Sequence, residues 1–200
     1  MPKLLLTLIS SFYLLQCPAQ KNYGVSQDYY IYQNNNSSIV PLIYYETKNS
    51  WYAAARYNYE ASEALSLQFG KNFSKQGKLC YSITPLAGIL TGNYKGFSMA
   101  AQAEIEVGKF NFFTEPEYCF QFKNQTENFF YNWAEISIQP SKTFYTGLAL
   151  QTMSRSNISL TNELGLLFGV SLKNFEIPLY FFRAPSTNYF VTGIHWRLEK

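Results

Sequence analysis

The chain has 200 residues, enough for one domain, of which 47% are hydrophobic, 18% aromatic and only 14% charged. Soluble domains carry about 25% charged residues, so this composition excludes an ordinary water-facing surface over much of the protein. The formal net charge of +3 is too small to indicate nucleic-acid binding, and no run reaches the roughly 18–20 apolar residues of a transmembrane helix. Low charge, abundant aromatic residues and the lack of such a run predict strands that cross a membrane.

The first twenty residues have the pattern of a cleaved export signal. Lys3 supplies a positive charge, Leu4 to Leu15 form an apolar stretch, and Cys17-Pro18-Ala19 offers small residues near a cleavage position. We therefore expect a signal peptide over 1–20 and one mature domain over 21–200. A buried N-terminal helix is the alternative. Cys17 also leaves lipidation open, although Gln16 is bulkier than the residue that usually precedes a lipidated cysteine.

Removal of the signal leaves two cysteines, Cys80 and Cys119. Export permits a disulfide, but the expected strands place the two residues on strands that are separated by a third. Next-but-one strands lie about 9.6 Å apart, which is beyond the reach of a disulfide. We predict two unpaired, partly buried thiols.

Apolar and polar residues alternate along nearly all of the chain after residue 35. From Phe97 to Val107, for example, Phe, Met, Ala, Ile and Val take every second position, and Ser, Ala, Gln and Glu take the others. This period of two is typical of half-buried strands. Several runs reach about 10–13 residues, whereas soluble strands peak near 5–6 and tilted membrane-crossing strands need about 9–11. The pattern predicts an outer-membrane β-barrel with an apolar outside and a polar inside; around Phe129 to Ile138 both faces are apolar, so the lipid-facing side stays open there.

The expected strands, in chain order, are 27–33, 37–46, 51–60, 63–71, 79–91, 96–107, 109–122, 129–140, 143–154, 159–172, 175–183 and 188–198. The first is the weakest, but it gives the even count that leaves both termini in the periplasm. We expect an all-β fold, a single antiparallel transmembrane β-barrel of about 12 strands, with 10 as the alternative. Tight and longer connections alternate, as in barrels with short periplasmic turns and longer outer loops. Pro116 and Pro178 fall inside expected strands, so we expect a bulge at each.

The positions of the lysines favour a membrane barrel over a soluble sheet. Nine of them fall in or beside the expected turns: Lys48, Lys71, Lys75, Lys78, Lys95, Lys109, Lys123, Lys142 and Lys173. A lysine that faces lipid near the membrane midplane costs about 2–4 kcal/mol, whereas one at the boundary costs little.

The whole mature chain resembles the small, mostly uncharacterised outer-membrane β-barrel proteins of Gram-negative bacteria. The resemblance rests on the signal, on the long alternating strands, on Phe129-Phe130-Tyr131-Asn132-Trp133, and on Thr84 to Gly88 followed by Gly92 to Gly96. It implies the fold and an outer-membrane location, with outer-membrane lipid and the barrel-assembly machinery as partners. It implies no substrate. The terminal Leu198-Glu199-Lys200 departs from the aromatic end of many such barrels, which puts recognition by that machinery in doubt.

Carboxylates gather on the polar face of the expected strands. A tight turn near Gly108 sets Gln102 opposite Glu115 and Ala100 opposite Glu117, so these acids form an inward cluster without direct like-charge pairs. An acidic pore wall favours cations or binds a divalent ion through oxygen ligands; alternatively, the acids pair with inward bases and fill the barrel. The candidate lumen cluster comprises Glu104, Glu106, Glu115, Glu117, Glu135, Glu163, Arg56, His195 and Arg197.

His195 is the single histidine and lies on the polar face of the last expected strand. Twelve-stranded membrane phospholipases use a histidine with a serine close after it, but Trp196 and Arg197 follow here. A lone histidine needs a nearby nucleophile for that chemistry, so we expect it to be a hydrogen-bonded lumen residue. Without a phosphate loop, zinc-ligand spacing or catalytic carboxylate pair, the sequence predicts neither an enzyme nor a cofactor.

The functional expectation is therefore a narrow channel or small-solute transporter in the cell outer membrane. Eight strands leave a filled interior and sixteen an open channel, so a twelve-stranded barrel can be either. One alternative is a plugged barrel with a structural or surface-binding role, and a less favoured one is a soluble exported barrel that binds an apolar ligand. No nucleic-acid partner is expected, and the oligomeric state stays open.

Overall fold

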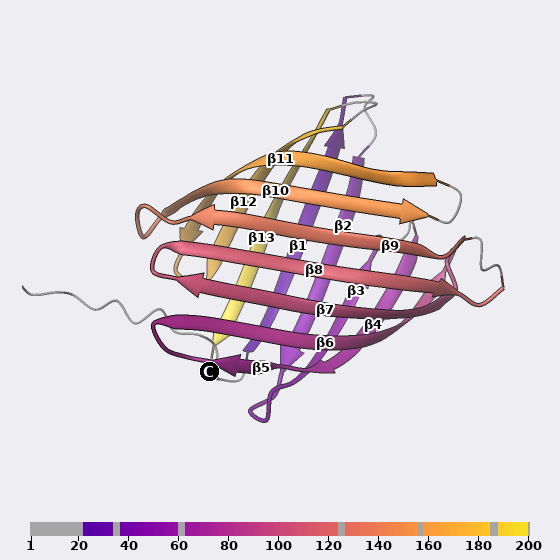
Figure 1. Ribbon diagram of the computed structural model, residues 1–200, viewed down its shortest axis with the longest axis horizontal. Coiled ribbons are helices and arrows are strands. Elements are labelled where there is room, and N and C mark those ends of the chain that lie inside the picture. Colours follow the sequence, from indigo (N-terminus) through magenta and orange to yellow (C-terminus); the bar gives the residue numbers. More distant parts are fainter. Residues whose placement is uncertain are drawn as a thin grey trace, which may run out of the picture.

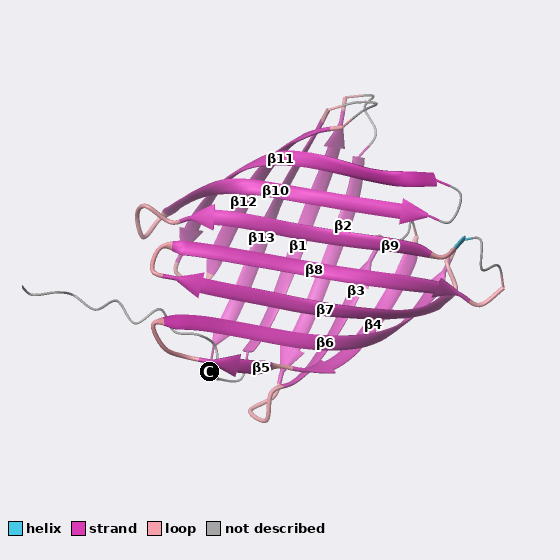
Figure 2. Ribbon diagram, viewed as in Figure 1, coloured by secondary structure: helices cyan, strands magenta, loops and turns pink. Residues whose placement is uncertain are grey.

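The computed structural model describes residues 22–33, 37–59, 63–123, 127–155, 158–184 and 188–199. The expected signal over 1–20 lies outside these ranges. No helix within them is long and apolar enough to cross a membrane. Strands take up nearly all of the described chain (Figure 2): β1 (Asn22–Tyr32), β2 (Ser37–Glu46), β3 (Trp51–Tyr57), β4 (Ala64–Lys71), β5 (Phe73–Lys75), β6 (Leu79–Gly92), β7 (Gly96–Val107), β8 (Phe110–Gln121), β9 (Phe129–Ile138), β10 (Phe144–Arg155), β11 (Ile158–Leu172), β12 (Phe175–Arg183) and β13 (Tyr189–Glu199).

The strands form one antiparallel sheet that closes into a barrel (Figure 1). The order runs β4-β3-β2-β1-β13-β12-β11-β10-β9-β8-β7-β6, and β4 pairs with β6 to close the ring. Short β5 continues β4 along β6 in the same register, since Gly70 pairs with Leu86 and Phe73 with Ile83. β4 and β5 are thus one strand that is interrupted at Asn72. The prediction of twelve strands is confirmed and the alternative of ten is wrong; the weak first strand is also longer than expected.

The barrel has two ends, which we name by what they carry. The terminal end, at the left and bottom of Figure 1, carries the paired chain ends Asn22 and Glu199 and the turns around residues 48, 108, 140 and 173. The opposite end is the loop end. The nine lysines lie at strand ends or in connections, as the sequence predicts. The expected alternation of connection lengths is only partly right, because β10 and β11 extend so far that two residues join them at the loop end.

The outer face of the barrel is apolar. Every second side chain on each strand points outward; Ile43, Leu67, Phe69, Met99 and Leu166, for example, are 49–60% exposed. A continuous exposed apolar surface of this kind marks contact with a membrane or another protein and not with water. The face that the sequence left open on β9 is now assigned, because Phe129, Tyr131 and Trp133 are buried inside the barrel and Ile136 is exposed outside.

The expected bulges at Pro116 and Pro178 are absent. The pairing of β8 with β9 runs through Pro116 opposite Asn132, and that of β11 with β12 runs through Pro178 opposite Gly169, both without a shift of register. On the other side of each proline the pairing is interrupted over two residue pairs, between β7 and β8 at Pro116 and between β12 and β13 at Pro178, and it resumes in the same register. A proline has no N–H to donate to the ladder. In the described strands, the register shifts instead between Met153 and Arg155 on β10, where this strand pairs with β11.

The two described cysteines are unbridged, as predicted. Cys80 lies on β6 and Cys119 on β8, with β7 between them. Both side chains are buried and face the lumen. Cys80 lies near the terminal end and Cys119 near the loop end, so the two thiols report on different depths of the barrel.

Leu166→Lys tests the lipid contact of the outer face. Leu166 lies near the middle of β11 and is 49% exposed, so we expect the substitution to destabilise the membrane-inserted barrel by about 2–4 kcal/mol. Leu172→Lys is the matched control, because Leu172 lies on the same face at the end of the same strand, where the cost falls to about 0–1 kcal/mol. Urea unfolding in lipid vesicles measures both. Equal costs for the two variants would contradict a membrane-facing surface.

Candidate functional site: the barrel lumen

Aromatic side chains fill the loop-end half of the lumen. We call this set the aromatic plug; it comprises Tyr30, Tyr32, Tyr59, Tyr94, Phe129, Tyr131, Trp133, Tyr180, Phe182 and Tyr189. The ring of Phe182 lies 5.4 Å from that of Trp133 and 5.1 Å from that of Tyr189. Leu167, Cys119 and Phe182 are at most 1% exposed. Side chains therefore fill this half of the barrel as far as the described residues reach.

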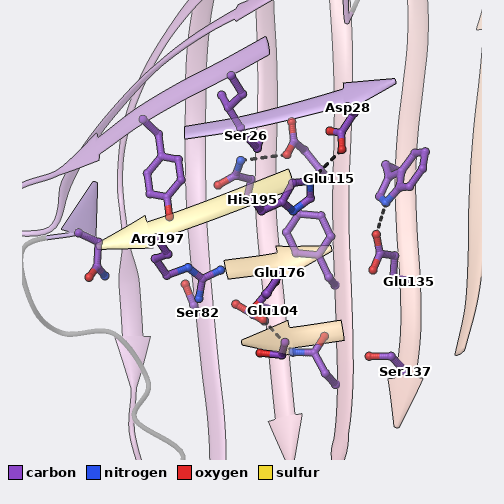
Figure 3. A pocket seen from close by; sticks show the side chains of 18 of the residues that line it. Ser26, Asp28, Ser82, Glu104, Glu115, Glu135, Ser137, Glu176, His195 and Arg197 are labelled. Carbon is purple, nitrogen blue, oxygen red and sulfur yellow. Dashed lines mark hydrogen bonds and ion pairs between the residues drawn. The ribbon is translucent and has the colours of Figure 1, made fainter. Parts of the chain in front are cut away.

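The terminal-end half of the lumen holds a cavity of about 620 Å³. The cavity reaches the turn residues Gly108, Lys109, Lys173 and Asn174, so it opens at the terminal end. Its lining carries seven carboxylates and four Lys or Arg side chains, namely Asp28, Glu46, Glu104, Glu106, Glu115, Glu135 and Glu176 with Arg56, Lys109, Lys173 and Arg197. Figure 3 shows Glu104, Glu176 and Arg197 extending into the same space from different strands. The cavity is therefore acidic.

All nine residues of the candidate cluster belong to the inward face, but the structure spreads them over the length of the lumen. Glu104, Glu106, Glu115, Glu135, Arg56, His195 and Arg197 line the cavity. Glu117 is 1% exposed and lies deeper in the wall. Glu163 lies at the plug, where its carboxylate accepts a hydrogen bond of 2.6 Å from the Tyr189 hydroxyl.

Arg56 forms a buried ion-pair cluster between the cavity and the plug. Its guanidinium donates to Glu115 through Nη1 and to Glu117 through Nη2, the latter at 3.1 Å. The Gln102 amide donates to Glu115 at 2.9 Å, and the Gln68 amide donates to Glu117 at 3.0 Å. Every carboxylate oxygen of the pair thus accepts a hydrogen bond. The predicted register is confirmed: Ala100 pairs with Glu117, and Gln102 hydrogen bonds with Glu115 across the same two strands.

His195 and Glu135 are both hydrogen-bonded lumen residues. The His195 Nε2 atom lies 2.8 Å from Asp28 Oδ1 (Figure 3), and Glu135 accepts from the Tyr180 hydroxyl at 2.8 Å. Sequence reasoning missed Asp28 as a partner because it treated the first strand as weak and assigned no inward face to it. Alternation of apolar and polar residues would have assigned Asp28 to the inward face, but in β1 this alternation is weak because Tyr residues occupy both faces of the strand.

No group of three or more His, Cys, Asp or Glu side chains in the described chain is placed to hold a metal ion.

Tyr59 and Tyr94 lie in connections between strands and enter the plug. Burial is the main cause that raises the pKa of each phenol above its usual value. Both therefore remain neutral hydroxyls at physiological pH.

Comparison with known proteins supports the fold and little else. No protein-family model matches the sequence, and no curated protein matches it. Among solved structures, the chain is similar to the KdgM porin, with a TM-score of 0.63 and 11% identity over 86% of this chain and 98% of that one. It is also similar to the NanC porin, with a TM-score of 0.61 and 9% identity over 89% of this chain and 99% of that one. The fold is therefore porin-like, as the resemblance implied.

Proposed function

We propose that the protein is a narrow outer-membrane channel for small solutes that prefers cations. The acidic cavity carries this proposal, because seven carboxylates face four Lys or Arg side chains in its lining. A low-dielectric wall focuses the field of one sign of charge and raises the local concentration of the opposite ion. Rings of acidic side chains select cations in other channels by this effect.

The outer face supports the membrane location over a soluble exported barrel. A soluble barrel that binds an apolar ligand would have a polar outside and an apolar cavity. Here the outside carries Ile43, Leu67 and Phe69 in contact with the surroundings, whereas the cavity at the terminal end is acidic. The porin-like fold is consistent with the same location.

The charge of the cavity separates the proposed solute from that of one structural neighbour. A second KdgM structure, with a TM-score of 0.62 and 10% identity over 88% of this chain and 98% of that one, is a complex with disordered oligogalacturonate. Oligogalacturonate is a chain of acidic sugars, so it carries many negative charges. Seven lining carboxylates would repel such a polyanion, and we therefore propose small cations and not acidic sugars.

Single-channel recording under a salt gradient tests the proposal. Purified protein in a planar bilayer should give small events whose reversal potential has the sign of a cation-selective pore. Glu104→Gln with Glu106→Gln should reduce that selectivity, since both carboxylates line the cavity. Glu63→Gln is the control, because Glu63 is an exposed residue of the loop end. Anion selectivity would contradict the proposal.

The aromatic plug favours a second candidate function, a closed barrel with a structural or surface-binding role. Its residues leave the loop-end half of the lumen filled, with Phe182 fully buried. In that case folded protein should give no conductance events, and the outer loops would be the working surface. The same recording separates the two candidates.

A further inference from the structure

Arg56 lies where the acidic cavity ends and the aromatic plug begins. It is on the inward face of β3 and is 4% exposed, although it also lines the cavity. Its two carboxylate partners lie on β8, which is separated from β3 by β4, β6 and β7 around the barrel. The side chain therefore crosses part of the lumen and does not lie along one strand pair.

Stability alone does not account for a buried cluster of this kind. Removing three charges from water is costly, and replacing a buried ion pair or triad with uncharged residues is often neutral or stabilising. Gln68 and Gln102 supply the two further hydrogen bonds that the carboxylates need. All four carboxylate oxygens of the cluster are thus hydrogen bonded, and the network holds Arg56 in one position.

The same guanidinium also contacts the plug. The Cζ atom of Arg56 lies 4.0 Å from the centre of the Tyr59 ring, in the geometry of a cation–π contact. The Tyr59 ring in turn packs edge-on against Tyr131, with the centroids 5.0 Å apart. Arg56 therefore connects the Glu115–Glu117 pair directly to the Tyr59 ring, and through that ring to Tyr131.

We propose that Arg56 is a tethered cation that closes the passage and sets its ion selectivity. It binds the Glu115–Glu117 pair, the carboxylates that a cation entering from the terminal end would meet last, and it holds Tyr59 in place within the plug. Displacing Arg56 from the pair frees both carboxylates for the passing cation and loosens the plug. We call this arrangement the Arg56 latch. Its role in conduction rests on the proposed channel function; its role in closing the plug does not.

Arg56→Met tests the latch, because methionine keeps an unbranched side chain and removes the charge. In planar bilayers we expect a larger conductance and a stronger cation preference than in the unmodified protein. Arg56→Lys should lie between the two, since a lysine cannot bind two carboxylates in the forked geometry of arginine. Arg183→Met is the matched control: it removes the same charge from an exposed position at the end of β12.

Cys119 gives a second readout that does not depend on conductance. The residue is 0% exposed and belongs to the same buried cluster as the aromatic plug, so a small cationic thiol reagent should modify it slowly in the unmodified protein. In Arg56→Met we expect modification at least about tenfold faster, the change that about 1.4 kcal/mol in the opening equilibrium produces. Mass spectrometry assigns the label to Cys119 and not to Cys80.

The variant Arg56→Met with Glu115→Gln and Glu117→Gln keeps the test valid if Arg56→Met alone does not fold. It removes all three charges together, so no unpaired charge stays buried. It should show the faster labelling of Cys119 without the stronger cation preference.

The outcomes separate the latch from the channel. A conducting protein in which the Arg56 variants change neither conductance nor Cys119 labelling would overturn the latch and leave the channel standing. Faster labelling of Cys119 without conductance in any variant would support the latch and overturn the channel.

Discussion

Phe182→Ala is expected to destabilise the folded barrel by about 3–5 kcal/mol, the usual cost of emptying a buried aromatic site. Phe182 is 0% exposed, and its ring packs against Trp133, Tyr180 and Tyr189. The neighbouring strands hold the wall of the barrel in place, so we expect the plug to collapse little into the space. Unfolding in urea from lipid vesicles measures the loss.

Phe181→Ala is the matched control for this prediction. Phe181 is the preceding residue on β12, points outward and is 37% exposed. Its replacement leaves a gap that lipid chains can fill, so the cost should be clearly smaller. We also expect Cys119 to react faster in Phe182→Ala and at its usual rate in Phe181→Ala. Equal destabilisation in the two variants would mean that the plug is not a packed core.

Arg56→Met is expected to cost about 3–5 kcal/mol of folding stability, because it leaves two buried carboxylates without their cation. The triple variant that also carries Glu115→Gln and Glu117→Gln should recover most of this loss. In it the two glutamine side chains can still hydrogen bond with Gln68 and Gln102. Arg183→Met should change stability little, since Arg183 is exposed.

Comparing the three variants separates the charge of the cluster from its packing. A triple variant as unstable as Arg56→Met would mean that the cost comes from lost packing around residue 56. The electrostatic account of the cluster would then be wrong. Heat-modifiability on gels, measured in parallel, shows whether each variant forms the barrel at all.

The sequence predicted the wall of the barrel because lipid imposes a strict rule on it. A side chain that points outward must be apolar, so the alternation from Phe97 to Val107 and the lysines in the turns followed directly from the membrane. The strand count required only that both ends of the chain lie on the same side. Even the pairing of Gln102 with Glu115 could be read from the turn at Gly108, because an antiparallel register is fixed once its turn is fixed.

The interior was harder to predict because no comparable rule applies to it. The sequence suggested small and polar lumen residues, whereas Tyr131, Trp133, Phe182 and Tyr189 fill one half of the lumen. The sequence of one strand does not distinguish an aromatic residue that faces the lumen from one that faces outward. The strands that contain Phe129 and Tyr180 carry aromatic residues on both faces. Which residues meet across the lumen depends on the closure of the ring, and this closure brings Arg56 to Glu117, 61 positions away.

Bulges at the two prolines were a reasonable expectation that the closed sheet did not require. Pro116 lies in register opposite Asn132, and Pro178 lies in register opposite Gly169. Each proline interrupts the pairing with one partner strand over two residue pairs, β7 for Pro116 and β13 for Pro178, and leaves the pairing with the other partner intact. A ring of long strands tolerates such a gap, so the expected local distortion does not occur.

Cell fractionation with a heat-modifiability gel tests the central claim, a barrel that spans the outer membrane, most directly. The account predicts that the protein is recovered in the outer-membrane fraction. It should migrate faster on the gel before boiling than after it, because the closed barrel resists the detergent until it is heated. Recovery in the soluble periplasmic fraction, with no shift on boiling, would contradict the membrane assignment and the channel with it.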